Sequence, residues 1–103
     1  MTIEELLSEL TDVSKKLDSA PDDESKFALN MLVLQLRQQL VAEAFDPLTD
    51  LAAIPGVDVR PLESLMLQVD QAIVTEQKRV QLVQQIVSLA NIALRSAGVT
   101  LPG

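Results

Sequence analysis

The chain has 103 residues, a length that fits one domain with a hydrophobic core of its own. It has no cysteine and no histidine, which excludes a disulfide framework, a thiolate nucleophile and the commonest general base and metal ligand. The net charge of −7 disfavours binding to nucleic-acid phosphates and to anionic membranes. Leucine, valine, alanine and glutamine dominate, and Phe27 and Phe45 are the only aromatic residues, so the composition favours helices over strands.

A first helix is predicted for residues 3–18. Thr2 and Glu5 match the S/T-x-x-E capping box, which satisfies two backbone N–H groups at a helix start. Apolar residues three and four apart then form one stripe: Ile3, Leu6, Leu10, Val13 and Leu17. Pro21 cannot continue the helix and biases Ala20 away from helical angles, so the helix ends before it.

A second helix is predicted for residues 23–45. The acidic run 22–24 lacks the ligand spacing of a calcium-binding loop, and we interpret it as a helix cap. Two apolar stripes follow on this helix: Leu29, Val33, Leu36, Leu40 and Ala44 on one side, and Phe27, Met31, Leu34, Val41 and Phe45 on the other. A helix that is apolar on two sides is expected to be packed on two sides, so this helix should be central. Leu10 and Leu36 are expected core residues.

The middle of the chain predicts a short helix over residues 47–53, with Asp46 as its N-cap and Pro47 at its first position. Two prolines and a glycine within residues 54–61 then predict a loop over residues 54–60. The apolar residues of this loop are expected to pack on the core, and an exposed binding edge is the alternative.

The last segment predicts one long helix over residues 61–97, closed by Gly98 as a C-terminal cap. Positions alternately four and three apart are apolar along the whole segment, with Glu76 as the only exception. The stretch VTEQKRVQ, residues 74–81, interrupts the apolar pattern with four polar residues but contains none of the usual turn residues. The alternative is a break near Glu76 that produces a compact four-helix bundle, because bundles share the same spacing.

A continuous helix of this length would be about 55 Å long, more than the two preceding helices can cover. Its uncovered stripe would face water, so we expect a homodimer whose second chain completes the bundle. Glu76 would then either pair with Lys78 or Arg79 of the other chain or lie near an exposed kink or the end of the interface. The candidate oligomer interface consists of Met66, Val69, Ile73, Glu76, Val80, Val83, Val87, Ala90 and Leu94.

The acidic charge is concentrated in the first half of the chain. Residues 1–50 carry 11 acidic and 4 basic side chains, whereas residues 51–103 carry 4 of each. Acidic residues of the first helix form a candidate surface for a basic partner: Glu4, Glu5, Glu9 and Asp12. The simpler interpretation is a solvated face that keeps the protein soluble.

Residue patterns for catalysis are missing, because the three glycines are isolated and no serine has a histidine base. Asn30, Asn91 and Glu76 are the only polar candidates for a binding site inside a bundle. The sequence therefore predicts a single all-α domain, residues 1–103, that is a soluble cytoplasmic protein without enzymatic activity or cofactor. We expect a protein-interaction or assembly protein of the scaffold, chaperone or adaptor type, with an acidic inhibitor of a basic partner site as the alternative. No stretch is specific enough to carry a resemblance to a known family.

Overall fold

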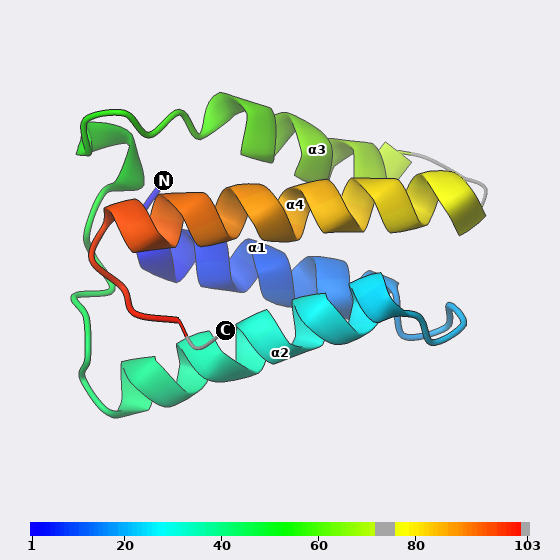
Figure 1. Ribbon diagram of the computed structural model, residues 1–103, viewed down its shortest axis with the longest axis horizontal. Helices are drawn as coiled ribbons and strands as arrows, with labels where there is room; N and C mark the ends of the chain where they lie inside the picture. Colours follow the sequence, from blue (N-terminus) through cyan, green and yellow to red (C-terminus); the bar gives the residue numbers. More distant parts are fainter. Residues whose placement is uncertain (72–75, 102–103) are drawn as a thin grey trace.

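The computed structural model describes residues 1–71 and 76–101. Regular structure in these ranges is helical, which confirms the all-α fold class (Figure 1). The elements are α1 (Ile3–Lys16), α2 (Glu24–Val41), the short 3-10 helix η1 (Leu51–Ala53), α3 (Arg60–Gln71) and α4 (Glu76–Ser96).

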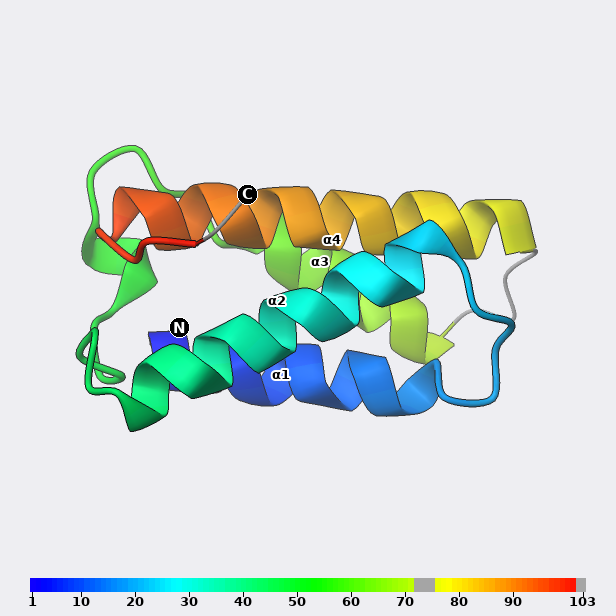
Figure 2. The same cartoon turned by 60° about the horizontal axis from the view of Figure 1, so that its bottom comes forward.

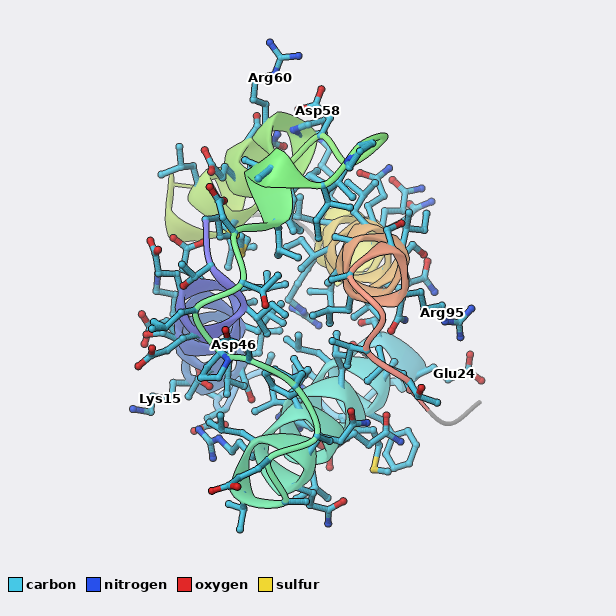
Figure 3. All side chains as sticks on the ribbon, turned by 90° about the vertical axis from the view of Figure 1, so that its left-hand side faces the viewer. Lys15, Glu24, Asp46, Asp58, Arg60 and Arg95 are labelled. Atoms are coloured by element: carbon cyan, nitrogen blue, oxygen red, sulfur yellow. The ribbon has the colours of Figure 1, made fainter. Side chains whose placement is uncertain are left out.

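The four α-helices form two antiparallel hairpins that pack on each other. α1 pairs with α2, α3 pairs with α4, and the hairpins meet chiefly where α2 lies against α4 (Figures 1 and 2). Seen from the end of the bundle, the helices follow the circular order α1, α2, α4, α3 around a common centre, from which Lys15, Arg60 and Arg95 point away (Figure 3). The connection 42–59 therefore has to cross one end of the bundle from α2 to α3.

The prediction of one helix over residues 61–97 is wrong. α3 and α4 lie side by side and run in opposite directions (Figure 1). The longest dimension of the molecule is 36 Å, too short for a helix of about 55 Å. The alternative, a compact bundle with a break near Glu76, is confirmed, and the radius of gyration of 13.1 Å is that of a compact monomer of this length.

The core draws on all four helices, on the connection 42–59 and on the segment after α4. The predicted core residues Leu10 and Leu36 are fully buried. In the loop 54–60, Val59 is buried and Ile54 and Val57 pack on the core, as expected. The largest fully buried side chains are Ile3, Leu6, Leu10, Leu29, Leu36, Leu51, Leu62, Ile86, Leu94 and Val83.

The start of α1 has the predicted capping box. The Thr2 Oγ1 accepts the N–H of Glu5, and the Glu5 side chain accepts the N–H of Thr2. The connection 42–59 supplies further acceptors, because the N–H of Ile3 donates to the carbonyl of Thr49 at 3.1 Å and the N–H of Glu4 to that of Pro47 at 2.9 Å. Free N–H groups at a helix start need such partners, so these bonds fasten the connection to the end of the bundle.

The predicted helix over residues 47–53 is reduced to η1, which begins at Leu51 with Asp50 as its N-cap. Asp46 accepts the N–H of Leu48, but in a turn rather than at a helix start. An α-helix from Pro47 would need the Leu51 N–H to donate to the Pro47 carbonyl. That carbonyl is used by α1, and the Leu51 N–H donates to the Met1 carbonyl at 2.9 Å instead. Pairing with the N-terminus therefore replaces the helix.

The ends of α2 and α4 use the same type of cap. At Gly98, φ is +85°, and the N–H groups of Gly98 and Val99 donate to the carbonyls of Arg95 and Leu94, which confirms the predicted cap. Glu43 occupies the corresponding position after α2 with φ of +56°, a conformation that costs a non-glycine residue roughly 1 kcal/mol. This cap ends α2 at Val41, four residues before the predicted end at residue 45.

Candidate interaction surfaces

The outer face of α2 is a row of exposed apolar side chains. Phe27, Leu34 and Val41 are 67%, 48% and 85% exposed, and the half-buried Met31 lies between the first two. This spacing of three, four and seven residues keeps the side chains on one side of the helix. The opposite side carries Leu29, Leu32, Val33 and Leu36, which are buried in the core. Within the monomer, the expected packing of the outer stripe is not met at Phe27, Leu34 and Val41, whereas Phe45 packs on the core.

The charges on α2 are turned away from this face. Residues 25–42 contain no acidic residue, and their only cations are Lys26 and Arg37. The Lys26 Nζ lies 3.2 Å from a carboxylate oxygen of Asp22 and donates to the carbonyl of Ala20 at 3.0 Å. Arg37 donates to the Thr11 hydroxyl of α1 at 3.1 Å. The outer face is therefore apolar and uncharged on a protein whose net charge is −7.

A second feature is a groove of about 840 Å³ between α3 and α4. None of the described residues that line it is charged. The lining residues are Pro61, Ser64, Leu65, Gln68, Gln81, Gln84, Gln85, Ser88 and Leu89. Amide and hydroxyl groups can donate and accept hydrogen bonds, so the groove has neutral polar walls over a partly apolar floor.

A third feature is an acidic groove of about 300 Å³ between α1 and α3. Glu9, Asp12 and Glu63 lie along it, together with Lys16 and the apolar Met66 and Leu67. Partial burial raises the pKa of Glu9, and the negative charges of Glu63, Glu5 and Asp12 raise it further. The acidic surface predicted from the sequence did not include Glu63, because only the packing of α3 on α1 brings it beside Glu9.

The predicted acidic surface residues Glu4, Glu5, Glu9 and Asp12 are all exposed on α1. Exposure leaves them accessible to solvent and to a partner alike. A basic partner for this surface stays a prediction.

Replacing Glu9 by glutamine should raise the urea midpoint slightly at neutral pH. The raised pKa means that ionised Glu9 is less favourable in the folded chain than in the unfolded chain. This penalty disappears as the pH falls below the ordinary carboxyl pKa, because Glu9 is then protonated in both states. Midpoints of the wild type and Glu9→Gln, measured from about pH 3 to 7, test the expectation.

The matched control for this prediction is Glu9→Gln in a Glu63→Gln background. There the gain in the urea midpoint should shrink, because the negative charge that raises the pKa of Glu9 most has been removed. A lower midpoint for Glu9→Gln at neutral pH would contradict the expected crowding of negative charge.

The predicted oligomer interface lies largely inside the monomer. Met66, Val83, Ala90 and Leu94 are buried in the core, and Val69, Val80 and Val87 are half-buried. Ile73 and the side chain of Glu76 lie outside the described residues. The stripe that would have faced a second chain is covered by α1 and α2 once α3 folds back on α4, so it is not available as the proposed dimer seam.

Polar residues do not gather into an interior site in the described part of the chain. Asn30 is exposed and accepts a hydrogen bond from the Ser14 hydroxyl, and Asn91 is half-buried on α4. Among residues 1–71 and 76–101, no three acidic side chains are arranged to hold a metal ion. None of the described helices is long and apolar enough to cross a membrane.

Comparisons with known proteins return no match: no family model fits the chain, and no curated protein or solved structure is similar to it.

Proposed function

We propose that this is a non-catalytic protein-interaction module that binds another protein chain through the outer face of α2. The observation that supports it is the alignment of Phe27, Leu34 and Val41 on one exposed side of a helix. Single exposed apolar residues are common on soluble proteins, whereas a contiguous apolar patch marks an interaction site. Two turns of helix separate each of these residues from the next, so the face is about 21 Å long.

Burying the outer face of α2 against a partner would lower the free energy of the protein. Burial of apolar surface is worth roughly 25 cal/mol per Å², and Phe27 is the largest contributor because aromatic side chains have the most area to bury. The core stripe of α2 already fixes the helix within the bundle. The outer apolar residues are therefore not needed to hold α2 in place, and their burial is left to a partner.

The chemistry of the face is more suitable for a protein than for a lipid surface or a nucleic acid. Helices that lie on membranes carry outward-facing lysines and arginines, whereas Lys26 and Arg37 are bonded back to the protein. Phosphate binding likewise depends on free cations. An enzymatic role receives no support from the chain's composition, because it contains no histidine or cysteine.

The experiment is photo-crosslinking in the cells that naturally produce the protein. A photoreactive phenylalanine analogue replaces Phe27, and the same analogue replaces Leu48 as a matched control. Both side chains are about two-thirds exposed, but Leu48 lies in the connection 42–59, away from α2. We expect covalent protein adducts from position 27 and not from position 48.

Mass spectrometry of the adducts then identifies the chain that was captured. An absence of adducts at position 27, or the same adducts at both positions, would contradict the proposal. Circular dichroism of each purified variant checks that the helical fold is retained.

A further inference from the structure

We infer that the chain bound by the outer face of α2 is a second copy of this protein, with the two α2 helices antiparallel across a two-fold axis at Leu34. This inference rests on the proposed function and names its partner. It also differs from the dimer expected from the sequence, because it uses α2 and leaves α3 and α4 in the monomer's core.

The spacing of the face is symmetric about Leu34. Phe27 precedes it by seven residues and Val41 follows it by seven, which is about 10.5 Å in each direction. In a two-fold interface the same patch meets itself with reversed order. Leu34 then faces Leu34, and each Phe27 faces the Val41 of the other copy, which places a large side chain against a small one at both ends.

The same two-fold axis also relates two polar residues of the outer face. Asn30 lies four residues before Leu34 and Gln38 four residues after it. Both are exposed, and the Asn30 Oδ1 also accepts a hydrogen bond from the Ser14 hydroxyl of α1. The symmetry therefore places the amide of one copy near the amide of the other. Amides carry donors and acceptors and can pair with one another without any charged partner.

Charge favours a second copy at this face over other parts of the surface. Two molecules of net charge −7 repel each other wherever their acidic surfaces meet. The outer face of α2 has no acidic residue between residues 25 and 42. Its two cations have partners within the chain, Lys26 in Asp22 and the exposed Arg37 in Thr11 of α1. A strongly basic partner would instead be steered to the acidic residues of α1. The uncharged face is thus the part of α2 where two copies approach with the least repulsion.

The antiparallel arrangement also separates the acidic run at the start of α2. A parallel pair would bring Asp22, Asp23 and Glu24 of both copies together. With its axis at Leu34, the antiparallel pair places the two Asp23 residues about 33 Å apart along the helices, which exceeds the screening length in physiological salt. Each run then lies opposite the end of the other copy's α2, which Glu43 and Asp46 follow in the sequence. Opposed helix dipoles favour the same arrangement.

The size of the face predicts a weak dimer. Three exposed side chains of this type present on the order of 300 Å² of apolar surface per copy. Two such faces bury less than the roughly 1,200 Å² of a standard stable interface. The dimer should therefore depend on concentration, with monomer near 10 µM and a clear shift toward dimer near 1 mM, both approximate values.

Sedimentation equilibrium of the purified full chain over that range is the first test. We expect the average mass to rise toward that of a dimer for the wild type and to stay at the monomer value for Leu34→Glu, which places two carboxylates at the two-fold axis. The matched control is Ile92→Glu, which adds the same charge at a 60% exposed position on α4 and should behave like the wild type. Equal loss of dimer in both variants, or a wild type that stays monomeric, would overturn the inference.

Disulfide trapping tests the antiparallel arrangement, and the absence of native cysteine makes the readout clean. Leu34→Cys should oxidise to a linked dimer, because the residue faces its own copy. Phe27→Cys should not link alone but should link when mixed with Val41→Cys. Efficient linking of Phe27→Cys to itself would indicate a parallel pair and overturn the arrangement.

The two proposals can fail separately. If the purified wild type stays monomeric while position 27 crosslinks to a different protein in cells, the second-copy inference is wrong and the interaction module stands. If position 27 captures nothing in cells and the purified wild type also stays monomeric up to about 1 mM, both are wrong.

Discussion

Leu36→Ala is expected to lower the free energy of unfolding by about 2–5 kcal/mol. Leu36 is fully buried where α2 faces the core, so its truncation removes apolar burial and leaves a cavity. Leu34→Ala, the same change two residues earlier on the same helix, removes a side chain that is 48% exposed and should lower the free energy by less than about 1 kcal/mol.

Urea unfolding at low micromolar protein concentration measures both effects while the chain is monomeric. Because the two substitutions alter helix propensity equally, their difference reports burial alone. Similar midpoints for the two variants would contradict the assignment of the inner and outer faces of α2.

Local signals in the sequence were reliable where a short segment determines its own structure. The capping box at Thr2 and Glu5, the acidic cap of α2 and the glycine after α4 are each set by hydrogen bonds within a few residues. The apolar spacing also identified Leu10 and Leu36 as core residues. These features do not depend on which helices become neighbours.

The continuity of the last helix could not be predicted in this way. Apolar spacing records which side of a helix is buried, and α3 and α4 bury their stripes in the same core. The pattern therefore stays in phase although the chain forms two helices. A weaker signal lies in the sequence between them, where Ile73, Val74 and Thr75 are three consecutive β-branched residues with low helix propensity.

The interaction surfaces depend on tertiary packing and were only partly predictable. The spacing showed a second stripe on α2, but whether the chain covers that stripe depends on where α1 and α4 lie. Glu63 joins Glu9 only because α3 packs on α1. The short helix over residues 47–53 was overestimated for the same reason, since the N-terminus takes the hydrogen-bonding groups that it would need.

Asp23→Ala should destabilise the fold by roughly 2–3 kcal/mol at neutral pH, because two interactions are lost together. The Asp23 carboxylate caps α2 by accepting the N–H of Lys26 at 2.9 Å and the hydroxyl of Ser25. It also lies 3.7 Å from the guanidinium of Arg79 on α4. The Arg79 side chain is only 17% exposed. The Arg79 Nη2 makes no hydrogen bond with any residue that the structure describes, so the carboxylate is the counter-charge that offsets its burial.

Asp22→Ala is the matched control. Asp22 is the neighbouring residue and loses the same charge, but its side chain is 98% exposed. Its ion-pair partner Lys26, whose side chain is 13% exposed, keeps a second partner in the carbonyl of Ala20 at 3.0 Å. Such pairs contribute about 0–1 kcal/mol, so Asp22→Ala should shift the unfolding midpoint little. An equal loss of stability in both variants would mean that the removal of one negative charge determines the effect, and not the loss of the cap and of the contact with Arg79.

The pH dependence separates the ionised carboxylate from simple packing. Hydrogen bonds from Ser25 and from the Lys26 N–H lower the pKa of Asp23 in the folded chain, with a smaller contribution from Arg79. A lowered pKa gives stability that is present in full above the unfolded-state pKa and is lost as the pH falls through the folded-state pKa. The difference between the wild type and Asp23→Ala should therefore shrink in acid. If it stayed constant from neutral pH to about pH 2, protonation of Asp23 would not matter, and the link between α2 and α4 would have to depend on contacts other than this charge.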